Sequence, residues 1–304
     1  MRNLLILIVI LISLNLKAQD SPPRTDIYLL DLVVQKNNVQ AISPELITSG
    51  NGYNNQPWFK TDDIIYFTSI KEDGQADIYS ATIQPETYLG EEMVKYNRVT
   101  TTSDLKEYSA QITPDGKSIS VVQVQPDDST QWLVKMNADG SNMQRLLPMT
   151  NPVGYYTWID NENVAAFVLG SPETLITGNA ISGYTKIIAS NIGRCIQKIP
   201  SSTCISYVDK SDSLKWNIIK YDPKTGLSEI IISCLPGSED YAWSPEGFLL
   251  MGSDGKLYKY NSLNDKSWIL VRDFNGTEVS DFYRLAVSPD GKKLAMVIFE
   301  GKKP

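Results

Sequence analysis

Short apolar runs, each followed by a tight polar turn, alternate along most of the chain. Residues 285–297 show the unit clearly, because an apolar strand enters the turn Pro289-Asp290-Gly291 and a second apolar strand leaves it. Proline presets φ at the first corner of such a turn, and glycine accepts the positive φ that follows. Short apolar runs separated by turns predict β-hairpins. No segment after residue 18 shows a sustained 3.6-residue period, so we expect an all-β chain.

The same strand-turn-strand unit recurs five more times, with some degenerate copies, at residues 57–67, 110–122, 157–167, 198–207 and 241–250. We anchor each copy at an apolar residue in its first strand, which gives the set Trp58, Ile112, Trp158, Ile199, Trp243 and Val287. The mean separation of these anchors is about 46 residues, the length of one propeller blade. Further strands are expected after the copies, for example at 77–83, 131–136 and 225–232. The sequence therefore predicts one six-bladed β-propeller of four-stranded antiparallel blades over residues 19–304.

The two ends of the chain are expected to share the last blade. The sixth copy reaches the final residue, Pro304, before a third strand can follow it. Segment 26–32 resembles the third-strand segment 77–83, and no first or second strand precedes it. N-terminal strands should therefore close the last blade, which would hide two strand edges.

The first 18 residues predict export from the cytoplasm. Arg2 precedes an uncharged apolar run from Leu4 to Leu14, the pattern of a signal-peptide h-region. Lys17 ends the run before it reaches the length of a membrane-spanning helix. We expect cleavage after Ala18, with an uncleaved N-terminal anchor as the alternative. The residue directly after the cleavage site is Gln19 and not cysteine, so a periplasmic or secreted protein without a lipid anchor or membrane insertion is expected.

Composition restricts the chemistry of the mature chain. The net charge of −7 would become −9 on cleavage, with 26 positive against 35 negative side chains. An acidic chain without basic clusters is poorly suited to nucleic acid. The sequence contains no histidine, which removes the commonest general base and metal ligand. We therefore expect no catalytic residue, metal or cofactor, with calcium held by carboxylates as the alternative.

Three cysteines are an odd number for an oxidising compartment. Cys195 and Cys204 flank a short turn around Pro200, so a disulfide across a hairpin is one expectation. The alternative is that these two and Cys234 are small buried apolar side chains.

Several turn motifs resemble the repeats of the TolB-like propellers, which contain an apolar or Trp residue, Ser-Pro-Asp-Gly-Lys and a later Asp-Gly-Ser-Asn turn. The matching segments are 243–247, 288–292, 113–117 and 139–142. The resemblance extends over essentially the whole mature chain and departs from the pattern at 160–163 and 200–203, where the Asp-Gly turn is replaced. It implies an envelope propeller that binds a protein or peptide partner at the mouth of its channel. A closed ring has little need to pair, so we expect a monomer.

The segments that lead into the first strand of each blade should form one mouth of the ring. Tyrosine recurs in five of these six segments, and its rigid apolar ring with a polar tip suits a binding surface. The alternative is that the rings pack between blades. The candidate binding residues are Tyr53, Asn55, Glu107, Tyr108, Tyr155, Tyr156, Arg194, Asp240, Tyr241, Asp281, Tyr283 and Arg284.

Two classes of function follow from these segments. Carboxylates in them, among them Glu239 and Asp240, could gather at the mouth and act as acid and base on a glycoside. A polysaccharide lyase or hydrolase is therefore the alternative, and the absence of histidine counts against it. The sequence favours a non-catalytic binding or scaffolding protein of the cell envelope.

Overall fold

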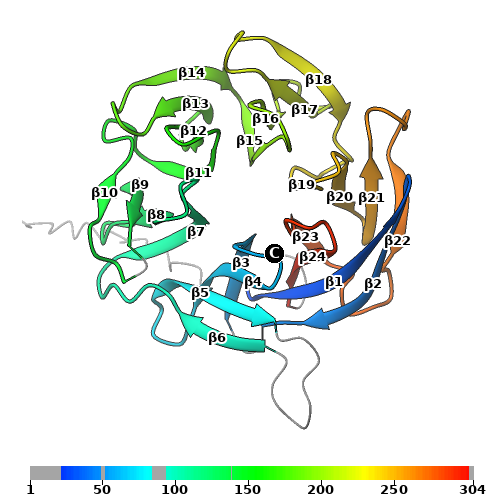
Figure 1. Ribbon diagram of the computed structural model, residues 1–304, viewed down its shortest axis with the longest axis horizontal. Coiled ribbons are helices and arrows are strands. Elements are labelled where there is room, and N and C mark those ends of the chain that lie inside the picture. The colour runs from blue at the N-terminus through cyan, green and yellow to red at the C-terminus, as the bar shows by residue number, and fades with distance from the viewer. Residues whose placement is uncertain (1–21, 49–51, 84–93, 138, 301–304) are drawn as a thin grey trace, which may run out of the picture.

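The computed structural model describes residues 22–48, 52–83, 94–137 and 139–300, in which all regular structure is β-strand. The strands form sheets arranged around a common centre, as in a β-propeller (Figure 1). The predicted signal peptide, residues 1–18, lies outside the described residues. Within the described ranges, no helix is long and apolar enough to cross a membrane.

Four sheets are four-stranded and antiparallel, each built from consecutive strands. One contains β7 (Lys106–Ile112), β8 (Ile119–Val124), β9 (Gln131–Met136) and β10 (Gln144–Arg145). The next contains β11 (Val153–Trp158), β12 (Asn163–Val168), β13 (Thr174–Asn179) and β14 (Thr185–Ser190). It is followed by β15 (Ile192–Lys198), β16 (Ile205–Asp209), β17 (Asn217–Tyr221) and β18 (Ser228–Ser233). The fourth contains β19 (Tyr241–Trp243), β20 (Leu249–Ser253), β21 (Lys256–Tyr260) and β22 (Ile269–Asp273).

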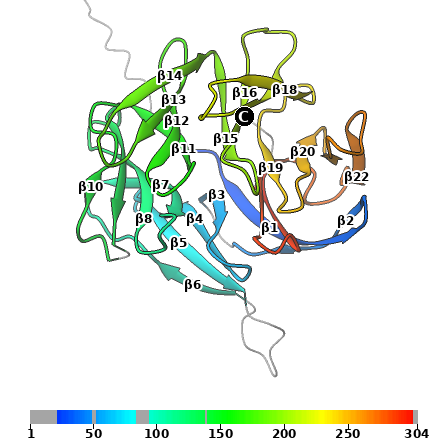
Figure 2. The same cartoon turned by 45° about the horizontal axis from the view of Figure 1, so that its top comes forward.

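The remaining eight strands are hydrogen-bonded into one sheet from the two ends of the chain. They are β23 (Phe282–Val287), β24 (Lys293–Phe299), β1 (Thr25–Gln35), β2 (Asn38–Leu46), β3 (Tyr53–Phe59), β4 (Ile64–Ile70), β5 (Ala76–Ile83) and β6 (Val94–Arg98). β1 runs antiparallel to β24 and pairs on its other side with β2, while one parallel contact, Thr25 with Tyr53, links β1 to β3. β2 lies beside β22 (Figure 2), where Arg272 donates a hydrogen bond to the carbonyl of Ala41.

The turns within the repeats have the chemistry that the sequence predicted. Asp290 accepts hydrogen bonds from the Ser288 hydroxyl (2.7 Å) and the Lys292 N–H (3.0 Å), and Gly291 has φ 74°. The turn at Thr113 repeats these contacts, with a hydroxyl donor to Asp115 at 2.6 Å. A residue with a side chain would be strained at this positive φ, which glycine adopts without strain. The turn can therefore reverse the chain within a few residues, so that one strand ends and the next begins.

Burial follows the position of a strand within its sheet. Every residue of β8 is buried, whereas no residue of the outer strand β18 is. Apolar side chains of neighbouring sheets pack between them, as Ile78 of β5 does with Ala110 of β7 and Val121 of β8. The second strand β8 therefore has both faces covered, and each fully buried isoleucine contributes about 2 kcal/mol of transfer free energy.

Two of the interfaces between sheets contain the same hydrogen-bonded cluster, which we call the seam clamp. In the first, Tyr156 and Trp158 of β11 both donate to the Ser120 hydroxyl on β8, at 2.8 and 2.9 Å. In the second, Tyr241 and Trp243 of β19 donate to Ser206 on β16, both at 2.8 Å. The clamp ties the first strand of one sheet to the second strand of the preceding sheet.

The predicted Cys195–Cys204 disulfide is not formed, and the three cysteines are free thiols. Cys204 lies opposite Ile199, whose N–H donates to its carbonyl at 3.0 Å. Cys195 is four residues further from the turn, and its sulfur lies 3.4 Å from the carbonyl oxygen of Tyr241 in the next sheet. The hairpin register therefore separates the two thiols.

Candidate functional site

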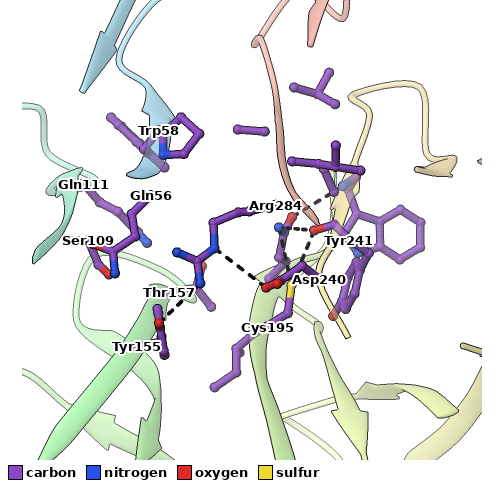
Figure 3. Close-up of a pocket in the computed structure, with 18 of the residues that line it drawn as sticks. Gln56, Trp58, Ser109, Gln111, Tyr155, Thr157, Cys195, Asp240, Tyr241 and Arg284 are labelled. Carbon is purple, nitrogen blue, oxygen red and sulfur yellow. Dashed lines mark hydrogen bonds and ion pairs between the residues drawn. The ribbon is translucent and has the colours of Figure 1, made fainter. Parts of the chain in front are cut away.

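The first strands of the sheets surround a central cavity of about 340 Å³ (Figure 3). Its lining comes from β3, β7, β11, β15, β19 and β23. Near the starts of these strands the lining includes Arg194, Asp240 and Arg284, while neutral polar side chains such as Gln56 and Gln111 line other walls. A charged cluster therefore lies at one end of the cavity, and the other lining residues are neutral apart from Lys198.

Two arginines share the carboxylate of Asp240. Arg194 binds it through two nitrogens, with Nε 3.3 Å from Oδ1 and Nη2 hydrogen-bonded to Oδ2. Arg284 approaches from the other side, with its Nε 3.8 Å from the same Oδ1. Although burial lowers the pKa of Arg194, the neighbouring Asp240 charge more than offsets this and raises it. Both guanidinium groups therefore remain charged in the cavity.

Arg284 extends from β23 to β3 at the other end of the chain and to β11 in another sheet. Its Nη1 donates to Asn55 Oδ1 on β3 at 2.8 Å, and its Nη2 donates to the Tyr155 hydroxyl on β11 at 3.3 Å. Its guanidinium also lies 5.7 Å from the ring centre of Tyr283, whose hydroxyl accepts a hydrogen bond from Asn55. The side chain is only 13% exposed. One arginine thus contacts residues that are up to 229 positions away in the sequence.

A second ion pair adjoins this cluster. Glu239 Oε1 lies 3.6 Å from Arg194 Nη1, and its Oε2 accepts a hydrogen bond from Lys210 Nζ at 3.0 Å. We call Arg194, Lys210, Glu239, Asp240 and Arg284 the charged cluster. It contains three cations and two carboxylates, so it has a net positive charge within an acidic chain.

A larger cavity of about 640 Å³, which we call the mouth cavity, lies next to the central one. Tyr53, Tyr108 and Tyr155 line it, and Tyr155 and Gln56 line both cavities. Burial raises the pKa of Tyr53 and raises that of Tyr108 to about 12, so both phenols are neutral at physiological pH. The mouth cavity therefore offers three neutral aromatic rings beside the charged cluster.

Solved structures with this arrangement of sheets have very different sequences. A protein assigned as a TolB from Agrobacterium tumefaciens superposes with a TM-score of 0.67 at 12% identity, covering 92% of this chain and all of that one. A TolB from Acinetobacter baumannii gives 0.56 at 13% identity over 91% of this chain and 65% of that one. An oligogalacturonate lyase in complex with manganese gives 0.51 at 11% identity over 92% and 98%. No protein-family model and no curated protein sequence matches the chain.

The chain has a TolB-type propeller fold. At identities this low the superpositions establish the fold alone, and they leave the use of the cavities open.

This fold brings ten of the twelve predicted binding residues to the two cavities or to the contacts of Asn55 and Arg284. The ten are Tyr53, Asn55, Tyr108, Tyr155, Tyr156, Arg194, Asp240, Tyr241, Tyr283 and Arg284. Among them, Tyr156 and Tyr241 line the central cavity and are also buried in the seam clamps, so they combine a place at the cavity with packing between sheets. The other two lie elsewhere. Asp281 is exposed outside both cavities.

The second of these, Glu107, is fully buried beside the mouth cavity rather than lining it. Its Oε1 accepts hydrogen bonds from Thr102 (2.7 Å) and Gln123 (3.4 Å), while its Oε2 has no hydrogen-bond partner among the described residues. Burial raises the pKa of Glu107 to about 7, although the hydrogen bond from Thr102 acts to lower this pKa. The carboxylate is therefore a source of pH-dependent stability.

Sequence patterns did not identify Gln56 and Ser109, which both line the central cavity. Each has a left-handed backbone, with φ of 56° and 55°, and each lies where its strand pairing shifts register. Such β-bulges re-aim side chains relative to strict alternation. The sequence has no glycine or other signal at these positions that would have revealed the bulges.

Two further kinds of reactive group bear on catalysis within the described ranges, the Cys195 thiol and any cluster of metal-binding side chains. Burial raises the pKa of Cys195, which lines the central cavity, so its thiol stays protonated and is a weak nucleophile. Among the residues that the structure describes, no three acidic, Cys or His side chains gather in a way that could hold a metal ion. The lining of the two cavities includes arginine, tyrosine and glutamine side chains.

Proposed function

We propose that this chain is an exported, non-catalytic propeller that binds a protein or peptide partner at the mouth of its channel. Its mature form, residues 19–304, would be a monomer in the periplasm or outside the cell, released by removal of residues 1–18. No resident cofactor is required for this role.

The observation that carries this proposal is the mouth cavity. Three tyrosine rings, from Tyr53, Tyr108 and Tyr155, line one hollow that adjoins the central cavity. Aromatic side chains with polar tips dominate the binding energy of many protein interfaces because they bury large apolar area at low entropy cost. The resemblance of the turn motifs to TolB-like repeats supports the same use of the mouth.

We also propose that the ring has six blades and is closed by the N-terminal strands. The pairing of β1 with β24 over seven residue pairs, against one pair with β3, supports division of the eight-stranded sheet into two blades. Closure of this kind would hide the edges of β24 and β1.

A site-specific crosslinking experiment tests the binding function. A photoreactive amino acid replaces Tyr108 in the mouth cavity or, as a matched control, Tyr184, which is 70% exposed on the outer rim. We expect one defined envelope protein to crosslink from position 108 and not from 184, and to be lost when Tyr53 is changed to Ala. Equal crosslinking from both positions, or none from 108, would contradict the proposal.

A polysaccharide lyase or hydrolase is the second candidate. Its support is the superposition on an oligogalacturonate lyase. Against it, Asp240 is engaged by Arg194 and Glu107 lines neither cavity, so neither of these two carboxylates is placed as a free acid or base in the channel. Formation of unsaturated product from polygalacturonate, followed by ultraviolet absorbance and abolished in Arg284→Gln, would favour this candidate over the binding function.

A further inference from the structure

We infer that the partner presents a carboxylate to the channel, from an acidic side chain or chain end of a peptide, and that Arg284 beside Arg194 binds it. This inference rests on the proposed peptide-binding function and adds the chemistry of the bound group.

The charge of the cluster is the first support. Three cations and two carboxylates leave one positive charge without a counter-charge in the charged cluster. A buried charge is costly unless an opposite charge or hydrogen bonds compensate it. Arg284 is the more weakly paired arginine, because Asp240 binds Arg194 through both oxygens. An incoming carboxylate would complete the pairing at Arg284.

The hydrogen-bond geometry of Arg284 points the same way. A guanidinium has five N–H donors in a planar fork that fits a carboxylate through two parallel bonds. Two nitrogens of Arg284 donate to neutral groups, Asn55 and Tyr155, and the 3.8 Å from its Nε to Asp240 exceeds hydrogen-bond length. Donor capacity therefore remains on a side chain that lines the central cavity (Figure 3).

Ser109 supplies an independent observation on the other side of the same cavity. Its hydroxyl oxygen is buried and has no hydrogen-bond partner among the described residues. Buried polar atoms normally have partners, and an unpaired one costs about 1–3 kcal/mol. A peptide backbone can both donate to and accept from a hydroxyl, so a peptide whose carboxylate reaches Arg284 could satisfy Ser109 as well.

The mouth cavity distinguishes a peptide from a small inorganic anion. Tyr155 lines both cavities and accepts the hydrogen bond from Arg284. A carboxylate at Arg284 would therefore place its neighbouring residue against the rings of Tyr53 and Tyr108. An apolar or aromatic residue next to the acidic one fits these neutral rings best.

A pair of isosteric peptides tests the inference on the full mature protein. N-acetyl-Phe-Asp-amide and N-acetyl-Phe-Asn-amide differ only in the charged group, and calorimetric titration gives both affinities. We expect the Asp peptide to bind at least about tenfold more tightly than the Asn peptide. Arg284→Gln should abolish this preference. Arg145→Gln, which removes an exposed arginine stacked on Trp132 outside both cavities, should preserve it.

The outcomes separate failure of the inference from failure of the proposed function. Equal binding of the two peptides to the wild type overturns the carboxylate site and leaves peptide binding standing. No binding of either peptide up to about 20 mM, together with Arg284-dependent binding of digalacturonate, overturns the peptide source and the proposed function. No binding of any of the three overturns both.

The comparison of the two peptides on the wild type needs no variant, so it remains decisive if Arg284→Gln does not fold. Arg284→Met, which keeps the aliphatic length of the side chain, is then the second variant, and a preference for Asp that survives it overturns the role of Arg284.

Discussion

Two pairs of adjacent residues show how close the packing interior and the candidate site lie. On β11, Tyr156 is buried in a seam clamp, where it donates to Ser120 and borders the central cavity alone, whereas Tyr155 lines both cavities and accepts from Arg284. On β7, Glu107 is fully buried, whereas Tyr108 lines the mouth cavity. Successive side chains of a strand point to opposite faces, so one step along the chain separates the two environments. The residue type alone does not indicate whether a side chain enters the packing interior or the candidate site.

The largest expected difference is between the two tyrosines of β11. Tyr156→Ala should lower the free energy of unfolding by about 4 kcal/mol, because it leaves a cavity between two sheets and removes the phenol that binds Ser120. Tyr155→Ala should lower it by about 1 kcal/mol, because its ring borders two cavities. Urea denaturation measures both, and equal losses would break the distinction.

Glu107 makes the comparison on β7 dependent on pH. Its pKa is raised to about 7 from 4.5, so the folded protein holds the proton more tightly than the unfolded chain does. The free energy of unfolding should therefore fall as the pH rises from 4.5 through 7. Glu107→Gln should raise it by about 3 kcal/mol at pH 8 and little at pH 4.5, as measured by denaturation across this range. Parallel pH curves for the two proteins would show that Glu107 is not the titrating group.

The second seam clamp provides the next effect in size. Ser206→Ala should lower the free energy of unfolding by about 2 kcal/mol, because Tyr241 and Trp243 both lose the acceptor of their buried donors. Ser211→Ala, at an exposed loop position, is the matched control and should change it by less than about 0.5 kcal/mol. If the two variants unfold at the same denaturant concentration, the clamp hydroxyl is not a stabilising acceptor.

The smallest expected effect comes from removing one hydroxyl at each of two neighbouring positions. Tyr156→Phe should lower the free energy of unfolding by about 1 kcal/mol, because its phenol is buried. Tyr155→Phe should lower it by less than about 0.5 kcal/mol, because its hydroxyl borders the cavities. Only Tyr155→Phe should weaken binding of the Asp peptide, since only it removes a partner of Arg284. Calorimetry measures the binding and denaturation measures the stability of the same samples. Weaker peptide binding in Tyr156→Phe, together with the larger stability loss in Tyr155→Phe, would show that the two roles are reversed.

Much of the strand pattern was predictable, because it depends on local chemistry. Five of the six anchor residues lie in the first strand of a sheet or of a group of consecutively paired strands. The sixth, Ile199, directly follows the first strand β15. Segments 26–32 and 77–83 lie in β1 and β5, each of which is the third strand of its run. The outer strand β10 is short, since only Gln144 and Arg145 pair with β9.

The candidate site was only partly predictable. Ten of the predicted residues lie at the cavities or in the contacts of Asn55 and Arg284, and they come from segments that the sequence had singled out for their tyrosines and charges. Glu107 and Asp281 lie outside both cavities. For Glu107 the reason is that the alternation of a strand does not show which face meets a neighbouring sheet. Gln56 and Ser109 were missed because their positions depend on bulges in β3 and β7.

The sequence by itself determined the all-β class, the turns and the order of the repeats, since each depends on contacts within a few residues. Only the tertiary structure decided that Arg284 meets Asn55 and Tyr155 and shares Asp240 with Arg194. These contacts join strands far apart in the chain, and they exist because the ring brings the starts of its inner strands to one centre. Packing between sheets and the bulges within them then select the side chains that face that centre.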